Sequence, residues 1–336
     1  MAKKKINILF ASPEVMPFAG TGGLGEVAGS LPAAVNALTA GEIDCRVIMP
    51  LYGSVREEFR HQMKNLGHTE IPVAWRSQYM GIFELEYEGV IYYFVDNEFY
   101  FKRDRIYGFG DDCERFSYFS RAIVESAQLT GFEPDIIHAN DWQTALVPVF
   151  CKTLCKDKDY KTVFTVHNVE YQGRYGYDMQ QDCIGLPEED EYLLRMGGDI
   201  NLMKGAIYSA DRFTTVSPNY AVELTYAISA FGLHEVVQRN LSKMQGILNG
   251  INTVAYDPGN DPYIAAAYSA SDLSGKRKCK SALQKQLGLP ERDVPLVTMI
   301  SRLVAPKGID LIAEMMDDFL DDNDIQFVML GTGDKE

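Results

Sequence analysis

Short apolar runs alternate with segments of helical periodicity along most of the chain, and this alternation constrains the fold more than any other feature. The first run, residues 6–12 (INILFAS), ends before Pro13 and predicts a buried parallel strand. Apolar residues then recur at helical spacing from Leu24 to Leu38, where Pro32 should kink or restart the helix. Similar apolar runs predict strands at residues 44–50, 135–141, 161–168 and 212–217. Strands alternating with helices predict an α/β fold with a doubly wound, mostly parallel sheet.

Two segments interrupt this alternation. Residues 82–96 alternate apolar residues with glutamates, which predicts a hairpin that turns near Gly89. Residues 251–275 are rich in Asp, Pro, Gly and Ser and predict a linker. We therefore expect an N-terminal domain over residues 1–250 and the start of a second, Rossmann-like domain over residues 276–336. Two strands and two helices do not complete a doubly wound domain, so we expect this second domain to be incomplete.

The composition narrows the range of partners. The chain has 47 acidic and 32 basic residues, a net charge of −15, which argues against a nucleic-acid partner. No apolar run approaches the length of about 18 residues that a membrane span needs, so we expect no membrane partner. The six cysteines form no CxxC pair and no recognisable zinc site, and we expect reduced thiols, no metal and a cytoplasmic location.

A glycine-rich loop within residues 17–32 carries the sequence GTGGLG from Gly20 to Gly25, which fits the pattern G-x-G-x-x-G. Dinucleotide binding requires the first glycine directly after a strand and an acid at the end of the second strand. Gly20 instead lies well beyond Ser12, and Asp44 opens the second strand. No Lys-Ser or Lys-Thr follows the last glycine, which excludes a Walker loop. Two interpretations remain: a tight loop with positive φ at glycine, or a helix start whose free N–H groups bind an anion such as pyrophosphate.

Seven sequence blocks resemble those of bacterial glycogen synthases and plant starch synthases, in the order of that family. The blocks are TGGLGEVAGSLP, HANDWQTALVP, TVHNVEYQG, INLMKGAIYSADRFTTVSPNYAVEL, GILNGIN, ISRLVAPKGIDL and LGTGD. The resemblance implies a two-domain glycosyltransferase-B fold, with the acceptor-side domain first. It also implies transfer of glucose from ADP-glucose to the non-reducing end of an α-1,4-glucan (glycogen or starch), with retained configuration and no metal or cofactor.

The resemblance also implies four catalytic residues: His167, Asp141, Arg302 and Lys307. Arg302 and Lys307 would clamp the donor diphosphate and stabilise its growing negative charge as glucose leaves. His167 and Asp141 end predicted strands and would lie against the transferred glucose. The alternatives are a solvated basic pair and a satisfied core histidine.

Further residues are expected to contact the substrates. The expected donor-binding residues are Gly20, Thr21, Gly22, Gly23, Asn249, Arg302, Lys307, Gly331 and Gly333. The aromatic candidates for acceptor or sugar contacts are Tyr100, Phe101, Tyr107 and Trp142.

The chain departs from the family pattern in two places. The family loop usually reads K-T-G-G-L, but here Gly20 replaces the lysine, which leaves open whether the donor is ADP-glucose or UDP-glucose. The family also carries an E-x-x-G-L block beyond LGTGD, and this chain stops before any such block. We therefore expect an inactive or weakly active fragment. The alternatives are a glucan-binding fragment without catalysis and a related glycosyltransferase that uses UDP-glucose.

Overall fold

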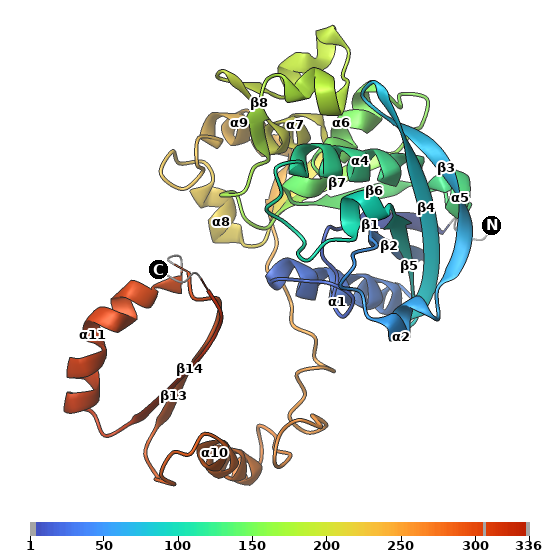
Figure 1. The fold of residues 1–336 in the computed structure, drawn as a ribbon. Helices are drawn as coiled ribbons and strands as arrows, with labels where there is room; N and C mark the ends of the chain where they lie inside the picture. The colour runs from blue at the N-terminus through green and yellow to red at the C-terminus, as the bar shows by residue number, and fades with distance from the viewer. Residues whose placement is uncertain (1–4, 305–306, 334–336) are drawn as a thin grey trace. The chain divides into compact units, whose positions relative to one another are not determined.

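The computed structural model describes residues 5–304 and 307–333, which form two compact units (Figure 1). The first unit ends at Ile251 and the second begins at Asn252. Each is described by itself below.

A nine-stranded sheet forms the centre of the first unit, counted over the described residues. Its strands are β1 Ile6–Ala11, β2 Ile43–Pro50, β3 Lys64–Val73, β4 Arg76–Tyr87, β5 Val90–Asp96, β6 Ile136–Asn140, β7 Lys161–Val166, β11 Arg212–Thr215 and β12 Met244–Gly246. The spatial order is β12-β11-β7-β6-β1-β2-β5-β4-β3, and neighbours are parallel from β12 to β5. At the other edge, β4 pairs in antiparallel fashion with both β5 and β3. The predicted α/β architecture with a mostly parallel sheet is confirmed.

Helices cover both faces of this sheet. They are α1 Gly23–Leu38, α2 Glu57–Arg60, α3 Glu98–Phe101, α4 Asp112–Glu125, α5 Ala127–Thr130, α6 Leu146–Thr153, α7 Leu202–Ser209, α8 Pro218–Glu223 and α9 His234–Arg239. In Figure 1, α4, α6 and α7 lie on one side of the central strands and α1 lies on the other. Helix α1 runs without interruption through Pro32, so the predicted restart there is wrong. Helix α8 begins with Ser217 as its N-cap, whose side chain accepts a hydrogen bond from the Tyr220 N–H, and with Pro218 in its first turn.

Shorter elements complete the first unit. They are the 3₁₀ helices η1 Trp142–Thr144, η3 Glu188–Leu193 and η4 Leu241–Lys243, the π-helix η2 Gln180–Ile184, and a small antiparallel sheet of β8 Arg174–Gly176, β10 Asp199–Asn201 and β9 Arg195–Met196. The hairpin of β4 and β5 turns at Gly89, as predicted. Strand β3 was not predicted, because a register shift between Asn65 and His68 breaks its alternation.

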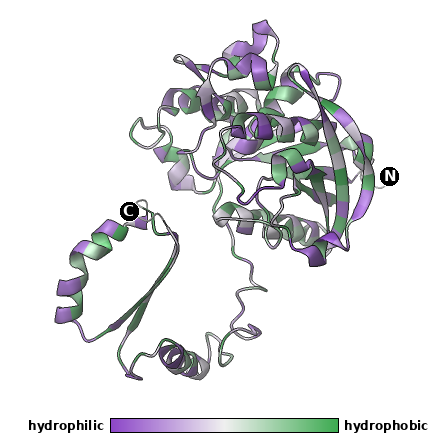
Figure 2. Ribbon diagram, viewed as in Figure 1, coloured by the Kyte–Doolittle hydropathy of each residue, from purple (hydrophilic) through white to green (hydrophobic). Residues whose placement is uncertain are grey.

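The second unit contains α10 Ser274–Gln286, β13 Leu296–Ile300, α11 Ile309–Asp322 and β14 Gln326–Leu330. Strands β13 and β14 pair in parallel, and Gln284 of α10 donates a buried hydrogen bond of 2.6 Å to Gln326 of β14. Helix α11 carries hydrophobic and hydrophilic residues (Figure 2), yet none of its residues is buried. The hydrophobic core cluster lies entirely in the first unit.

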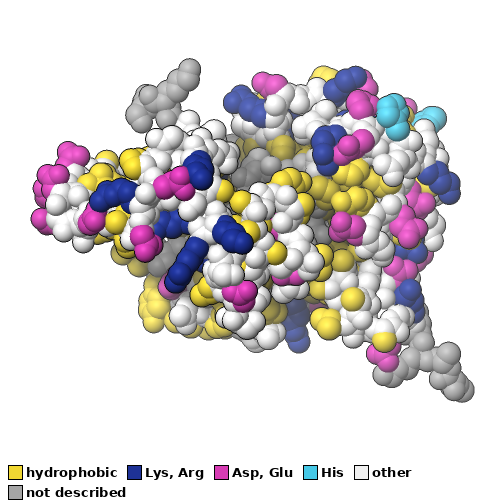
Figure 3. All heavy atoms as spheres, turned by 90° about the horizontal axis from the view of Figure 1, so that it is seen from below, with side chains coloured by type: hydrophobic (Ala, Val, Ile, Leu, Met, Phe, Trp, Pro, Cys, Tyr) yellow, Lys and Arg dark blue, Asp and Glu magenta, His cyan; other side chains and the backbone are white. Residues whose placement is uncertain are grey.

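The surface agrees with the acidic composition. On the face shown in Figure 3, Lys and Arg side chains are interspersed with Asp and Glu. None of the helices in the described part of the chain combines the length and hydrophobicity needed to span a lipid bilayer.

Candidate active site

The carboxyl ends of β1, β6 and β7 meet at one edge of the sheet, because these neighbouring strands are parallel. Open α/β sheets bind ligands at this edge. Three chain segments leave the sheet here: the glycine loop after β1, the segment from Asp141 after β6 and the segment from His167 after β7.

Asp141 connects two of these segments. Its backbone has φ 56°, a conformation that non-glycine residues rarely adopt, and its N–H donates to the Thr165 carbonyl at 2.9 Å. Its carboxylate Oδ1 accepts the backbone N–H groups of His167 at 2.7 Å and of Asn168 at 3.4 Å. Such strained backbone persists only where its surroundings hold it, and it concentrates at functional sites.

Burial raises the pKa of Asp141 to about 7. The hydrogen bonds from His167 and Asn168 oppose this rise, and the nearby charge of Glu14 adds to it. Near neutral pH, this carboxyl group can therefore hold or release a proton.

The imidazole of His167 is oriented by a residue that the sequence analysis missed. Its Nε2 lies 3.0 Å from Oδ1 of Asn140, whose Nδ2 donates to the Ala11 carbonyl at 3.1 Å. Because the Asn140 amide donates to that carbonyl, its oxygen faces His167, and Nε2 carries the proton. Burial lowers the pKa of His167 to about 4, so the ring is neutral and its Nδ1 is left as an acceptor.

The glycine loop runs into the start of α1, as the anion-binding interpretation requires. Gly22 is the N-cap residue without a side-chain cap, and no atom lies within 4 Å of a Cβ placed at Gly22 or Gly23. Gly22 and Gly23 are exposed, and the N–H groups of a first helical turn have no intrahelical partner, as an anion site at a helix start requires. Gly20 and Gly25 instead serve close packing, since a Cβ at Gly20 would lie 3.0 Å from Sδ of Met16. None of these glycines has positive φ, so the tight-loop interpretation is wrong on that point.

Glu14 supports this loop, and sequence reasoning missed it. Its side chain is buried, and both carboxylate oxygens accept from Thr21: Oε2 from the backbone N–H and Oε1 from the hydroxyl at 2.8 Å. The backbone N–H and the hydroxyl of Thr21 are therefore both engaged within the protein. The position of Glu14 just beyond the first strand was the signal that could have indicated it.

The aromatic candidates divide into two groups. Tyr100 and Phe101 are 0% exposed and pack against Tyr118, so their interpretation as sugar contacts is wrong. Their positions on the short helix α3 turn both rings into the core, which aromatic content alone could not reveal. Tyr107 is half-buried, with a hydroxyl that is buried without a hydrogen-bond partner in the described structure. Trp142, next to Asp141 in the sequence, is half-buried. Its ring packs edge-on against the ring of Phe116, with 5.1 Å between the ring centroids.

The second unit carries the basic candidates. Arg302 lies two residues beyond Ile300, the last residue of β13, and both Arg302 and Lys307 are exposed. Beyond the strands, the Leu303 N–H donates to the Thr332 carbonyl at 2.9 Å. This close pairing explains why glycines occur here. A Cβ added to Gly331 would lie 2.2 Å from the carbonyl oxygen of Ser301, and one added to Gly333 would lie 2.0 Å from the carbonyl oxygen of Leu303.

Asn249 belongs to the first unit. It is exposed and lies in an irregular segment after β12. No cluster of three or more His, Cys, Asp or Glu residues that could hold a metal occurs within residues 5–304 and 307–333.

Comparisons with known proteins agree with this geometry. The family model described as "Starch synthase catalytic domain" matches residues 7–239. Glycogen synthase of Bacillus subtilis (strain 168) is 41% identical over 98% of this chain and 69% of the relative. Glycogen synthase of Lactobacillus acidophilus is 42% identical over 98% of this chain and 70% of the relative. The catalytic domain of starch synthase IV from Arabidopsis thaliana, bound to ADP and acarbose, superimposes with a TM-score of 0.88 at 35% identity, covering 98% of this chain and 69% of that one.

Proposed function

The chain belongs to the starch synthase catalytic-domain family and is a glycosyltransferase of the glycogen and starch synthase type, and from this premise we propose its donor, acceptor and site residues. The donor is ADP-glucose, and the acceptor is the non-reducing end of an α-1,4-glucan. The structural relative that binds ADP and acarbose supports this pairing, because ADP is the product that ADP-glucose leaves.

The observation that carries the site assignment is the strained Asp141, whose carboxylate holds the backbone of His167 at the sheet's ligand-binding edge. In the reaction, the bond from the glucose anomeric carbon to the diphosphate breaks. A new bond forms from that carbon to the acceptor hydroxyl oxygen, with retention. The proton of that hydroxyl leaves with the diphosphate.

Each group has a part in this exchange. Asp141 and His167 position the transferred glucose through hydrogen bonds. The N-terminus of α1 at Gly22 and Gly23 carries a partial positive charge, which attracts the donor anion. Arg302 and Lys307 bind the diphosphate and stabilise the charge that it gains. Asn249, Trp142 and Tyr107 are further contacts in this proposal.

The remaining proposals concern the surroundings of the reaction. The excess of acidic residues supports partners other than nucleic acid and anionic membranes. The six cysteines are all free thiols, which fits the reducing cytoplasm.

The test is glucosyl transfer from ADP-glucose and from UDP-glucose onto glycogen, with Asp141→Asn and His167→Ala beside the unmodified chain. We expect weak transfer from ADP-glucose by the unmodified chain, and transfer at least about a hundredfold weaker still in both variants. His61→Ala, at an exposed position outside the site, is the matched control and should leave transfer unchanged. Glycogen binding without transfer from either nucleotide sugar would contradict the proposal and favour a binding protein.

A further inference from the structure

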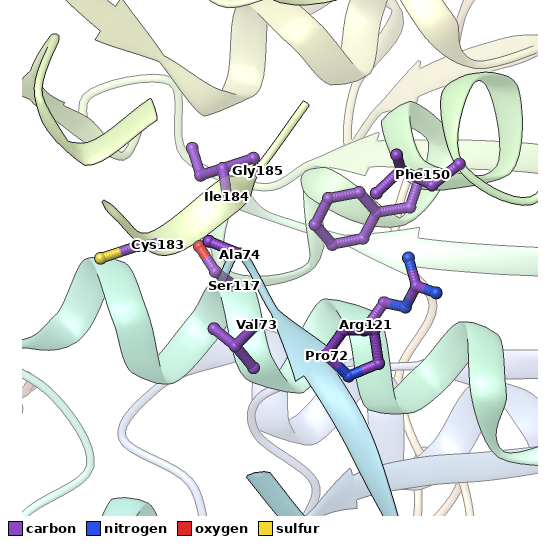
Figure 4. A pocket seen from close by; sticks show the side chains of 10 residues that line it. Pro72, Val73, Ala74, Ser117, Arg121, Phe150, Cys183, Ile184 and Gly185 are labelled. Carbon is purple, nitrogen blue, oxygen red and sulfur yellow. The ribbon is translucent and has the colours of Figure 1, made fainter. Parts of the chain in front are cut away.

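A cavity of about 180 Å³ lies within the first unit, and none of its lining residues is among those proposed to bind donor or acceptor (Figure 4). Its walls come from the end of β3, the turn that follows, α4, the C-terminal part of α6, and η2 with the residue after it. The apolar part of the wall includes Val73, Phe150, Leu154 and Ile184.

Two polar groups on α4 line this cavity without satisfying all their hydrogen bonds. Ser117 is 1% exposed, and its Oγ has no partner within the described part of the chain. The Nε of Arg121 is likewise buried without a partner. The two residues are four positions apart on one helix, so their side chains project from the same face. Buried donors are almost always paired, which makes this combination a sign of a missing acceptor.

The charge around Arg121 favours an anionic acceptor. Its Nη2 donates to the Glu125 carboxylate at 2.7 Å, but that carboxylate also pairs with Lys158 at 3.3 Å. One acid therefore faces two cations. Asp182, which precedes the lining residue Cys183, is itself paired with Arg76 at 3.0 Å. An acceptor that reaches the free Nε–H would meet a charged donor that is only partly neutralised.

The size and lining limit the rest of the ligand. An apolar cavity of about 150 Å³ holds a benzene molecule, so this cavity accepts a compact body of similar size. We propose that it is a binding site for a small monocarboxylate with a compact apolar body. The carboxylate accepts from Arg121 Nε–H and Ser117 Oγ–H, and the apolar part packs against Phe150 and Ile184. This site goes beyond the transfer reaction and does not depend on it.

The test uses sodium benzoate as the probe, titrated into the full chain by isothermal calorimetry with saturation-transfer NMR. Benzamide, which has the same shape without the charge, should bind at least about tenfold more weakly, because charge-assisted hydrogen bonds are the stronger ones. Ser117→Leu fills the cavity and should abolish binding. Ser209→Ala removes another buried, unpartnered hydroxyl outside the cavity and is the matched control.

A second variant protects the test against misfolding. Arg121→Lys retains a cation for Glu125 but removes the Nε–H, and should weaken benzoate binding about tenfold. No benzoate binding to the unmodified chain would overturn the proposal and leave the cavity to water. Unchanged affinity in folded Ser117→Leu or in Arg121→Lys would overturn it equally. Benzamide binding as tightly as benzoate would overturn the assignment to a carboxylate.

Discussion

At the scale of single residues, the candidate site depends on groups whose ordinary properties the fold changes. Asp141 is the clearest case, because its backbone is held at positive φ and burial raises its pKa to about 7. The sequence predicted that Asp141 and His167 each end a strand, since apolar runs predict where strands stop. It could not place Glu14 or Asn140. The hydrogen bond from Asn140 to Ala11 joins residues 129 positions apart and exists only in the folded chain.

Replacing Asp141 by Asn should change the pH dependence of stability. A carboxyl group with a raised pKa contributes most stability below its unfolded pKa of 3.8, and this contribution is lost as the pH rises through about 7. Asp141→Asn removes this loss. From pH 5 to pH 8, the stability of the variant relative to the unmodified chain should therefore rise by about 3 kcal/mol.

Urea unfolding followed by tryptophan fluorescence measures this difference in the first unit, where Trp75 and Trp142 both lie. An equal difference between the two proteins at pH 5 and pH 8 would contradict the assigned shift.

Glu14→Gln tests the support of the glycine loop. Glutamine retains the shape of the side chain but offers only one acceptor oxygen to Thr21, so the loop should loosen. We expect a higher KM for ADP-glucose, about threefold to tenfold, with a smaller change in kcat. Steady-state kinetics measure both. A fall in kcat alone would instead assign Glu14 to the chemical step.

At the scale of elements, regular strands and helices were predictable and irregular ones were not. The strands β1, β2, β6 and β7 are rich in apolar residues and show no strict alternation, because helices cover both faces of the sheet. Strand β3 contains a register shift, and β8, β9 and β10 have only two or three residues. None of these four strands therefore shows a regular alternation of apolar and polar residues. Helix α1 tolerates Pro32 in its interior, where the helix continues although one backbone hydrogen bond is missing.

Gly331→Ala tests the pairing beyond β13 and β14. The added Cβ would lie 2.2 Å from the Ser301 carbonyl oxygen, so the two segments must separate. Hydrogen exchange in β13 and β14 should accelerate at least about tenfold. Gly250→Ala, where no atom lies within 4 Å of the added Cβ, should leave exchange unchanged. Equal exchange in both variants would show that the pairing is not tight.

At the scale of the whole molecule, the two units differ in how much hydrophobic surface they bury. The core cluster belongs to the first unit, whereas Leu311 and Met315 of α11 are 69% and 47% exposed. The alternating pattern predicted both units, but it carried no information about burial in the second. Burial depends on how many elements pack together, which periodicity within each element does not report.

A chain ending at Ile251 should therefore retain the stability of the first unit. We expect its tryptophan-detected unfolding midpoint to lie within about 3 °C of that of the full chain, since a midpoint shift scales with the stability lost. The full chain should bind more of a hydrophobic dye than the shortened one, because of the exposed apolar residues of α11. A loss of cooperative unfolding after shortening would show that the first unit needs the second.

The close approach of Met16 to Gly20 means that the two positions are coupled in mutation. A lysine at position 20, usual in the family, would press its Cβ to 3.0 Å from the Met16 sulfur. Gly20→Lys alone should therefore impair the loop, whereas Gly20→Lys combined with Met16→Ala should restore donor affinity in a double-mutant cycle. If the two substitutions simply add, Met16 does not restrict this position. If they do not add, the residue tolerated at position 20 of the glycine loop depends on the residue at position 16. A lysine can then be accepted at position 20 only after Met16 has been replaced by a smaller residue.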